Sequence, residues 1–152
     1  MRKVTNSTIV GTAQALPEFK NLFSVKAPSK LLTAVALHED DIVVRYKAYE
    51  KARVSICEQL ADKDENGKPE MIPIEVNGEV QKDANGNPIT KYKLSPENSV
   101  LVEQQIADLG DAMVDVQSYQ LSLDDIKDFN VEPAMFPHIS PFLKYFVKFD
   151  VE

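Results

Sequence analysis

Two segments in which apolar residues recur at steps of three and four constrain this chain more than any other feature of its sequence. They span residues 28–60 and 96–117. Apolar residues at this spacing form one stripe along a helix, and the stripe must be buried against another element. The stripes consist of Leu32, Val35, Ile42, Tyr46, Tyr49, Ile56 and Leu60 (interrupted at Glu39 and Arg53) and of Val102, Ile106, Leu109, Met113 and Val116. We therefore predict two long helices that pack together as an antiparallel hairpin.

The segment 61–95, between the two helices, is rich in turn-forming residues. The motif Asp-x-Asn-Gly-x-Pro occurs at 64–69 and again at 83–88, and Asn77-Gly78 lies between them. Asn-Gly pairs favour the positive φ values of tight hairpin turns. We predict a β-hairpin around Asn77-Gly78 at the tip of the helical hairpin, with 89–94 as the third strand of a possible meander. The motif itself is too short to predict a repeat architecture.

Capping residues and prolines divide the rest of the chain. Thr5, Asn6 and Ser7 can cap a first helix, which Pro17 should end or kink, so that 5–26 forms short helices. Ser95, followed by Pro and Glu, is a typical start for the second long helix. Residues 121–126 predict a strand or turn that leads into a capped helical turn. The remainder of 118–152 is a closing, partly helical segment rich in proline and aromatic residues.

These elements predict an α+β fold that is mainly α, in one domain covering residues 1–152. The closing segment carries four aromatic residues within eight positions, Phe142, Tyr145, Phe146 and Phe149. They either cap the hydrophobic core or form a partner-binding or oligomer surface. The lone Cys57 lies within the helical pattern and is interpreted as a small buried hydrophobic residue.

Charge is unevenly distributed along the chain, whose net charge is −7. Residues 1–60 carry a net charge of +3 and residues 61–152 a net charge of −10. The acidic half disfavours nucleic-acid binding, because it repels the phosphate backbone. We expect Asp108, Asp111 and Asp115 on one face of the second helix. That face is either a solvated surface or a phosphate-mimicking surface for a basic partner.

No pattern of residues predicts catalysis, a metal site or a cofactor. The cluster 38–41 contains a histidine and three acids, but too few of them share a helix face to bind a metal. His138 has no matching nucleophile or acid nearby in sequence. The motif at 64–67 resembles the start of a calcium loop but lacks its later ligands, so we interpret it as a turn. We expect a protein that is not an enzyme.

No apolar run approaches the length of a membrane span, and no apolar stretch of a signal peptide follows the basic N-terminus. We therefore expect a protein that is not secreted through a signal peptide and does not insert into a membrane.

The order of motifs resembles a phage-encoded family of unknown function. That family has a short helix, a long helix, a turn of the Lys-Asp-Glu-Asn-Gly type, a β-hairpin, a second long helix and a closing Leu-Ser-x-Leu…Pro…Phe element. This chain has the turn at 63–67, the sequence Leu-Ser-Leu at 121–123, and the later elements at 131–135 and 141–143. The resemblance implies a small accessory protein of phage or prophage origin, located in the cytoplasm of the infected bacterium or in the virion.

Two functions follow from these features. The first is a non-catalytic virion or assembly component that binds phage structural proteins or further copies of itself. The alternative is an intracellular inhibitor of a host factor or defence enzyme, with the acidic helix as a phosphate decoy.

Overall fold

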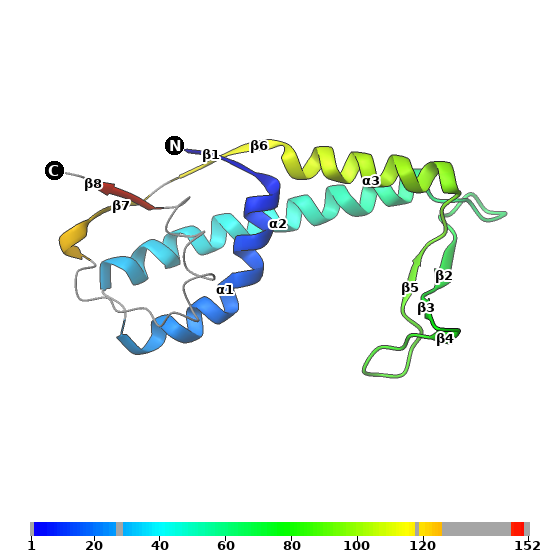
Figure 1. Ribbon diagram of the computed structural model, residues 1–152, viewed down its shortest axis with the longest axis horizontal. Coiled ribbons are helices and arrows are strands. Elements are labelled where there is room, and N and C mark those ends of the chain that lie inside the picture. The colour runs from blue at the N-terminus through cyan, green and yellow to red at the C-terminus, as the bar shows by residue number, and fades with distance from the viewer. Residues whose placement is uncertain (1, 27–28, 118, 126–146, 151–152) are drawn as a thin grey trace. The chain divides into compact units, whose positions relative to one another are not determined.

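The computed structural model describes residues 2–26, 29–117, 119–125 and 147–150. In these residues it is a mixture of helix and sheet (Figure 1). The α-helices are α1 (Asn6–Lys26), α2 (Ser29–Leu60) and α3 (Pro96–Asp111), and the strands form short pairs. The chain divides into two compact units, one formed by Met1–Glu50 with Gly110–Glu152 and the other by Lys51–Leu109. We call them unit 1 and unit 2.

Among its described residues, unit 1 contains two strand pairs besides its helices. Strand β1 (Arg2–Thr5) pairs antiparallel with β6 (Met113–Val116), and Val4 lies opposite Val114. Strand β7 (Tyr119–Ser122) pairs in parallel with β8 (Val147–Asp150). A short 3-10 helix, η1 (Leu123–Asp125), follows β7, which confirms the predicted strand and helical turn as far as residue 125; residue 126 lies outside the described residues.

The hydrophobic core of the described residues lies mostly in unit 1. Its buried hydrophobic side chains come from both chain segments that form the unit. They are Val4, Ile9, Leu16, Leu31, Ala34, Val35, Ile42, Val116 and Leu121. Several are completely inaccessible, and burial of a side chain of this size typically contributes about 1.5–3 kcal/mol. The two short strands that contain Val4 and Val116 are therefore held by packing as well as by their backbone hydrogen bonds.

In the first half of α2, the buried stripe keeps Val35 and Ile42 of the predicted one and differs at the positions before and between them. Leu31, Val35, His38 and Ile42 follow one another at steps of four, three and four, and all are buried. Leu32, which we assigned to the stripe, is 39% exposed. The predicted interruption at Glu39 disappears because the ring of His38 occupies the neighbouring stripe position. A histidine can do this because its ring has an apolar body and a polar edge.

Helix α1 is one continuous helix, where we predicted short helices separated at Pro17. It runs through Pro17 to Lys26, and its ribbon changes direction along its length (Figure 1). Proline lacks the N–H that would bond to the carbonyl four residues earlier, so a bend is the usual result when a helix continues past it. At its start, Thr5 acts as the predicted cap, because its hydroxyl accepts a hydrogen bond from the Thr8 amide at 3.2 Å.

Helix α3 ends at Asp111, six residues before the predicted end at 117, and β6 follows it. Ser7 and Gly110 meet where α3 ends. The Ser7 hydroxyl donates to the Gly110 carbonyl at 3.0 Å, and a Cβ on Gly110 would lie 2.7 Å from this oxygen. The Asn6 amide also donates to the Ala112 carbonyl at 3.0 Å. Residues 113–116 therefore form a strand instead of continuing the helix, because β1 pairs with their backbone.

In unit 2, side-chain hydrogen bonds define the adjoining ends of the two helices. The Ser95 hydroxyl accepts a hydrogen bond from the Asn98 amide at 3.2 Å, which confirms the predicted cap of α3. The Asn98 side chain donates to the Leu60 carbonyl at 2.8 Å, satisfying one of the free carbonyls at the end of α2. Because of this bond, the first turn of α3 lies against the last turn of α2.

The insert between these helices contains two separate strand pairs. Strand β3 (Glu75–Val76) pairs with β4 (Glu79–Val80), which confirms the hairpin at Asn77-Gly78; Asn77 and Gly78 have φ values of 55° and 81°. Strand β2 (Met71–Pro73) pairs with β5 (Thr90–Tyr92). The chain before the hairpin turn therefore forms two strands, β2 and β3, which Ile74 separates. Residues 89–94 extend no meander, because β5 lies beside β2 instead of β4.

Candidate interaction surface

The two Asp-x-Asn-Gly-x-Pro motifs form the same hydrogen-bonded turn. In the first, Asp64 Oδ1 accepts hydrogen bonds from the Asn66 and Lys68 amides, both at 2.8 Å. In the second, Asp83 Oδ1 accepts from the Asn85 and Asn87 amides, both at 2.9 Å. The carboxylate of each motif therefore organises the backbone of its own turn.

The glycine of each motif provides the change of chain direction. Gly67 has a φ of 75° and Gly86 a φ of 83°, in the left-handed region that other residues adopt at a cost. Their amides donate to the carbonyls of Asp64 and Asp83, at 2.9 Å and 3.0 Å. The backbone hydrogen bond from Asn87 is the main cause that lowers the pKa of Asp83 below its ordinary value.

Each turn closes onto a ring of three backbone hydrogen bonds. In the first ring, Asp62 N donates to Lys93 O at 2.9 Å, Lys93 N to Glu70 O at 2.9 Å, and Glu70 N to Asp62 O at 2.8 Å. The second ring joins Gln81, Ile74 and Ile89 in the same way. Its three bonds, Gln81 N to Ile74 O, Ile74 N to Ile89 O and Ile89 N to Gln81 O, are all 2.8 Å long.

A local twofold relation connects the two turns and the two rings. The two motifs begin 19 residues apart, at 64 and 83. A shift of +19 converts Asp62 and Glu70 of the first ring into Gln81 and Ile89 of the second. A shift of −19 converts Lys93 into Ile74. The pairing of β2 with β5 has the same symmetry. The pair of Ile72 with Lys91 lies at its centre, and the pairs Met71 with Tyr92 and Pro73 with Thr90 lie on either side. The helices leave from one ring and the hairpin β3–β4 leaves from the other.

Unit 2 has almost no core of its own. Among its hydrophobic residues only Ala61 and Val102 are buried, at 5% and 6% exposure. The insert is therefore shaped mainly by backbone hydrogen bonds and turn chemistry. Several large hydrophobic side chains of unit 2 are exposed, namely Val54, Met71, Val76, Val80, Ile89, Val100 and Leu101. The sequence pattern did not predict these exposed apolar side chains, because they lie outside the apolar stripes of the two helices.

The three aspartates predicted on one helix face do not share a helix. Asp108 and Asp111 are exposed residues of α3, but Asp115 lies in β6, where it pairs with Lys3 of β1. The prediction failed because it depended on the helix continuing to residue 117. The three carboxylates therefore do not form one extended surface along α3.

The aromatic residues of the predicted partner surface fall mostly outside the described residues. Phe142, Tyr145 and Phe146 belong to 126–146, which lies outside them. Phe149 belongs to β8, and its backbone pairs with that of Leu121 in β7. The alternatives of a core cap and a partner surface therefore both stay predictions.

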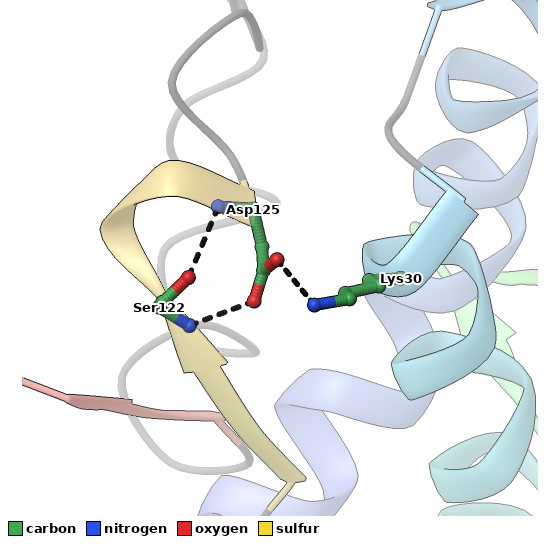
Figure 2. A network of polar contacts seen from close by, with 3 residues as sticks. All are labelled: Lys30, Ser122 and Asp125. Atoms are coloured by element: carbon green, nitrogen blue, oxygen red, sulfur yellow. Dashed lines mark hydrogen bonds and ion pairs between the residues drawn. The ribbon is translucent and has the colours of Figure 1, made fainter.

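A polar network joins the start of α2 to the turn after β7 (Figure 2). Lys30 Nζ lies 2.6 Å from Asp125 Oδ1, and the Ser122 amide donates to Asp125 Oδ2 at 2.9 Å. The Asp125 amide donates to the Ser122 hydroxyl at 3.3 Å, so the two side chains cap η1 reciprocally. The hydrogen bond from Lys30 is the main cause that lowers the pKa of Asp125 to about 2. This network holds η1 against the start of α2 within unit 1.

Two residues with reactive side chains, His38 and Cys57, lie within helix α2. His38 is buried in the stripe of α2, and its burial lowers the pKa of its ring. Cys57 is only half-buried, which corrects the prediction of a buried residue. Within the described ranges, no group of three or more His, Cys, Asp or Glu residues could hold a metal ion.

Comparisons with protein-family models, with curated proteins and with solved structures found no match to this chain. In the part of the chain that the structure describes, none of the helices has the length and apolar character needed to cross a membrane. The candidate site that remains is the exposed surface of unit 2, with its apolar side chains and its hydrogen-bonded insert.

Proposed function

We propose that this chain is a non-catalytic accessory protein of a phage or prophage, which acts through protein–protein contacts as a virion or assembly component. One observation supports the contact role: unit 2 exposes several large hydrophobic side chains while burying only Ala61 and Val102. Exposed apolar side chains on a segment with so little core offer surface that a partner can bury. The phage origin rests on the motif resemblance.

In this proposal α2 and α3 form an antiparallel helical hairpin that carries the insert at its tip. The hydrogen bond from Asn98 to the Leu60 carbonyl supports this arrangement, as does the bond from the Tyr92 hydroxyl to Glu58 at 3.1 Å. The buried Val102 on α3 provides further support. The helices act as a support, and the surfaces that bind other proteins belong to unit 2.

The alternative is an intracellular inhibitor of a host factor or defence enzyme, with α3 as a phosphate decoy. It draws on the acidic residues of α3, Glu97, Glu103, Asp108 and Asp111, and on the lack of Lys or Arg in this helix. It is the weaker proposal, because Asp115 lies in β6 and the acidic helix face is shorter than predicted.

Mass spectrometry of purified particles of the encoding phage, with infected-cell lysate as the comparison, tests the proposal. The expected result is recovery of this chain from the particles in a fixed ratio to a known capsid or tail protein. A chain abundant in the lysate and absent from particles at every stage of assembly would contradict the structural role and favour the inhibitor.

A further inference from the structure

The outward surfaces of the two helices in unit 2 carry both apolar and charged side chains. On α2, Lys51, Val54 and Glu58 are exposed and follow one another at steps of three and four. On α3, the exposed residues at steps of four, three and four are Glu97, Leu101, Gln104 and Asp108. Residues at these steps share one helix face. We call these two sets the outer faces of α2 and α3.

The helices of unit 2 bury too little apolar surface to be a complete packing unit. Along the predicted stripes, Ile56, Leu60, Ile106 and Leu109 are all only half-buried. Meanwhile Val54, Val100 and Leu101 are exposed by 37%, 63% and 44%. Short helices and two-stranded ladders are marginal without further packing. A second protein surface that covers these side chains would supply the missing burial.

The charges of the two outer faces indicate which protein could cover them. The outer face of α3 carries Glu97 and Asp108 and no base, whereas the outer face of α2 carries one base, Lys51, at its start and one acid, Glu58, at its end. Among the described residues, neither Lys51 nor Glu97 belongs to an ion pair. Lys51, at the start of the α2 face, is thus complementary to Glu97, at the start of the α3 face, and one chain contains both.

We propose that a second copy of this chain covers the outer faces. The outer face of α2 in one copy packs parallel to the outer face of α3 in the other, so that Lys51 lies beside Glu97 of the partner copy. Val54 then meets the partner's Leu101. A twofold axis repeats this contact, because an isologous interface uses each patch twice. This inference deepens the proposed contact function and rests on it, since it names the partner as a second copy.

Charge-reversal variants test the pairing by sedimentation velocity of the full chain. Lys51→Glu places two like-charge pairs in its homodimer, and Glu97→Lys does the same. Each variant alone should dimerise about tenfold more weakly than the wild type, as expected for losing two exposed ion pairs. An equimolar mixture restores both pairs in the heterodimer, so the mixture should regain wild-type affinity. The difference in affinity between the mixture and either variant alone should decrease as the salt concentration rises from about 0.05 M to about 0.5 M.

A matched pair of apolar substitutions tests the location of the interface. Leu101→Glu should abolish dimerisation, because it places an acid against Val54 and beside Glu97. Leu37→Glu changes a residue of α2 in unit 1 that is 61% exposed, and should leave dimerisation unchanged. Circular dichroism should give the same helix content for both variants, because each substituted side chain is exposed in the monomer.

Three results would overturn the inference. The first is a wild-type chain that stays monomeric up to about 200 µM in low salt, a concentration that would reveal even a weak dimer. The second is a mixture of the two charge variants that associates no better than either alone. The third is a Leu37→Glu variant that dissociates the dimer while Leu101→Glu does not. A dimer absent from phage particles would contradict the virion role and leave the dimer intact, whereas a monomer found in particles would contradict only the dimer.

Discussion

At the scale of single residues, the position of His38 predicts how the stability of the protein responds to pH. His38 is 4% exposed, within the stripe that packs α2 into unit 1. Burial is the main cause that lowers its pKa from the ordinary value of 6.5, and the opposing effect of Asp41 is smaller. Burial favours the neutral ring, so protonation of His38 weakens the folded state.

This shift predicts a pH dependence of stability with a definite sign. Because the folded-state pKa lies below 6.5, His38 contributes its full stability above that pH. The contribution is lost as the pH falls from the unfolded pKa toward the folded pKa. We expect the urea midpoint of the wild type to fall between about pH 7.5 and about pH 5.5. His38→Leu should show a smaller fall over this range.

The comparison isolates His38 because both proteins share every other titrating group, including His138. Urea unfolding followed by circular dichroism at the two pH values provides the measurement. An equal fall in both proteins would show that other groups cause the pH dependence. A wild type that loses less stability on acidification than His38→Leu would contradict the buried neutral ring itself.

At the scale of elements, the two turns of the insert provide the most direct prediction. Gly67 and Gly86 adopt positive φ at equivalent positions of the local twofold arrangement. Alanine in this conformation costs about 1 kcal/mol, so each substitution should increase turn opening roughly fivefold. Amide hydrogen exchange at Lys68 for Gly67→Ala, and at Asn87 for Gly86→Ala, measures the effect. We expect the two variants to respond alike.

Gly11 provides the matched control for these substitutions. It lies in α1, a Cβ added to it would meet no heavy atom within 4 Å, and its φ is not positive. Gly11→Ala should therefore stabilise the helix by roughly 0.5–1 kcal/mol instead of destabilising it. If Gly86→Ala left exchange at Asn87 unchanged while Gly67→Ala accelerated exchange at Lys68, the equivalence of the two turns would be wrong.

Local signals in the sequence predicted several elements correctly. The end of α2 at Leu60, the Ser95 cap and the hairpin at Asn77-Gly78 all agree with the structure. Each depends on residues within a few positions of one another, where capping and turn chemistry act. The repeated motif was also visible, but its symmetry was not, because the symmetry depends on which strands pair.

The errors arose where a distant segment changes the local preference. Met113 and Val116 are three residues apart, a spacing that fits a helix stripe, yet they belong to β6. The choice depends on β1, whose backbone supplies the hydrogen bonds of the ladder more than a hundred residues away in sequence. Similarly, the stripe of α2 shifted because His38, a polar residue in the sequence pattern, packs in the core. Neither effect can be read from local periodicity.

At the scale of the whole molecule, the two units obtain their stability in different ways. Unit 1 gathers nearly all the buried hydrophobic residues, whereas unit 2 depends on turns, rings of backbone hydrogen bonds and an incomplete helix surface. A segment with little buried apolar surface opens easily in the monomer. Binding to a partner stabilises such a segment by mass action. We therefore expect the protein contacts that we propose to involve unit 2.

Hydrogen exchange of the wild-type chain by mass spectrometry, at about 1 µM and about 200 µM protein, tests this division most directly. Peptides from 51–60 and 96–109 should become more protected at the higher concentration, while peptides from 31–42 should be equally protected at both. Protection in unit 2 that is high at the lower concentration and independent of protein concentration would show that unit 2 needs no partner, and would contradict the account.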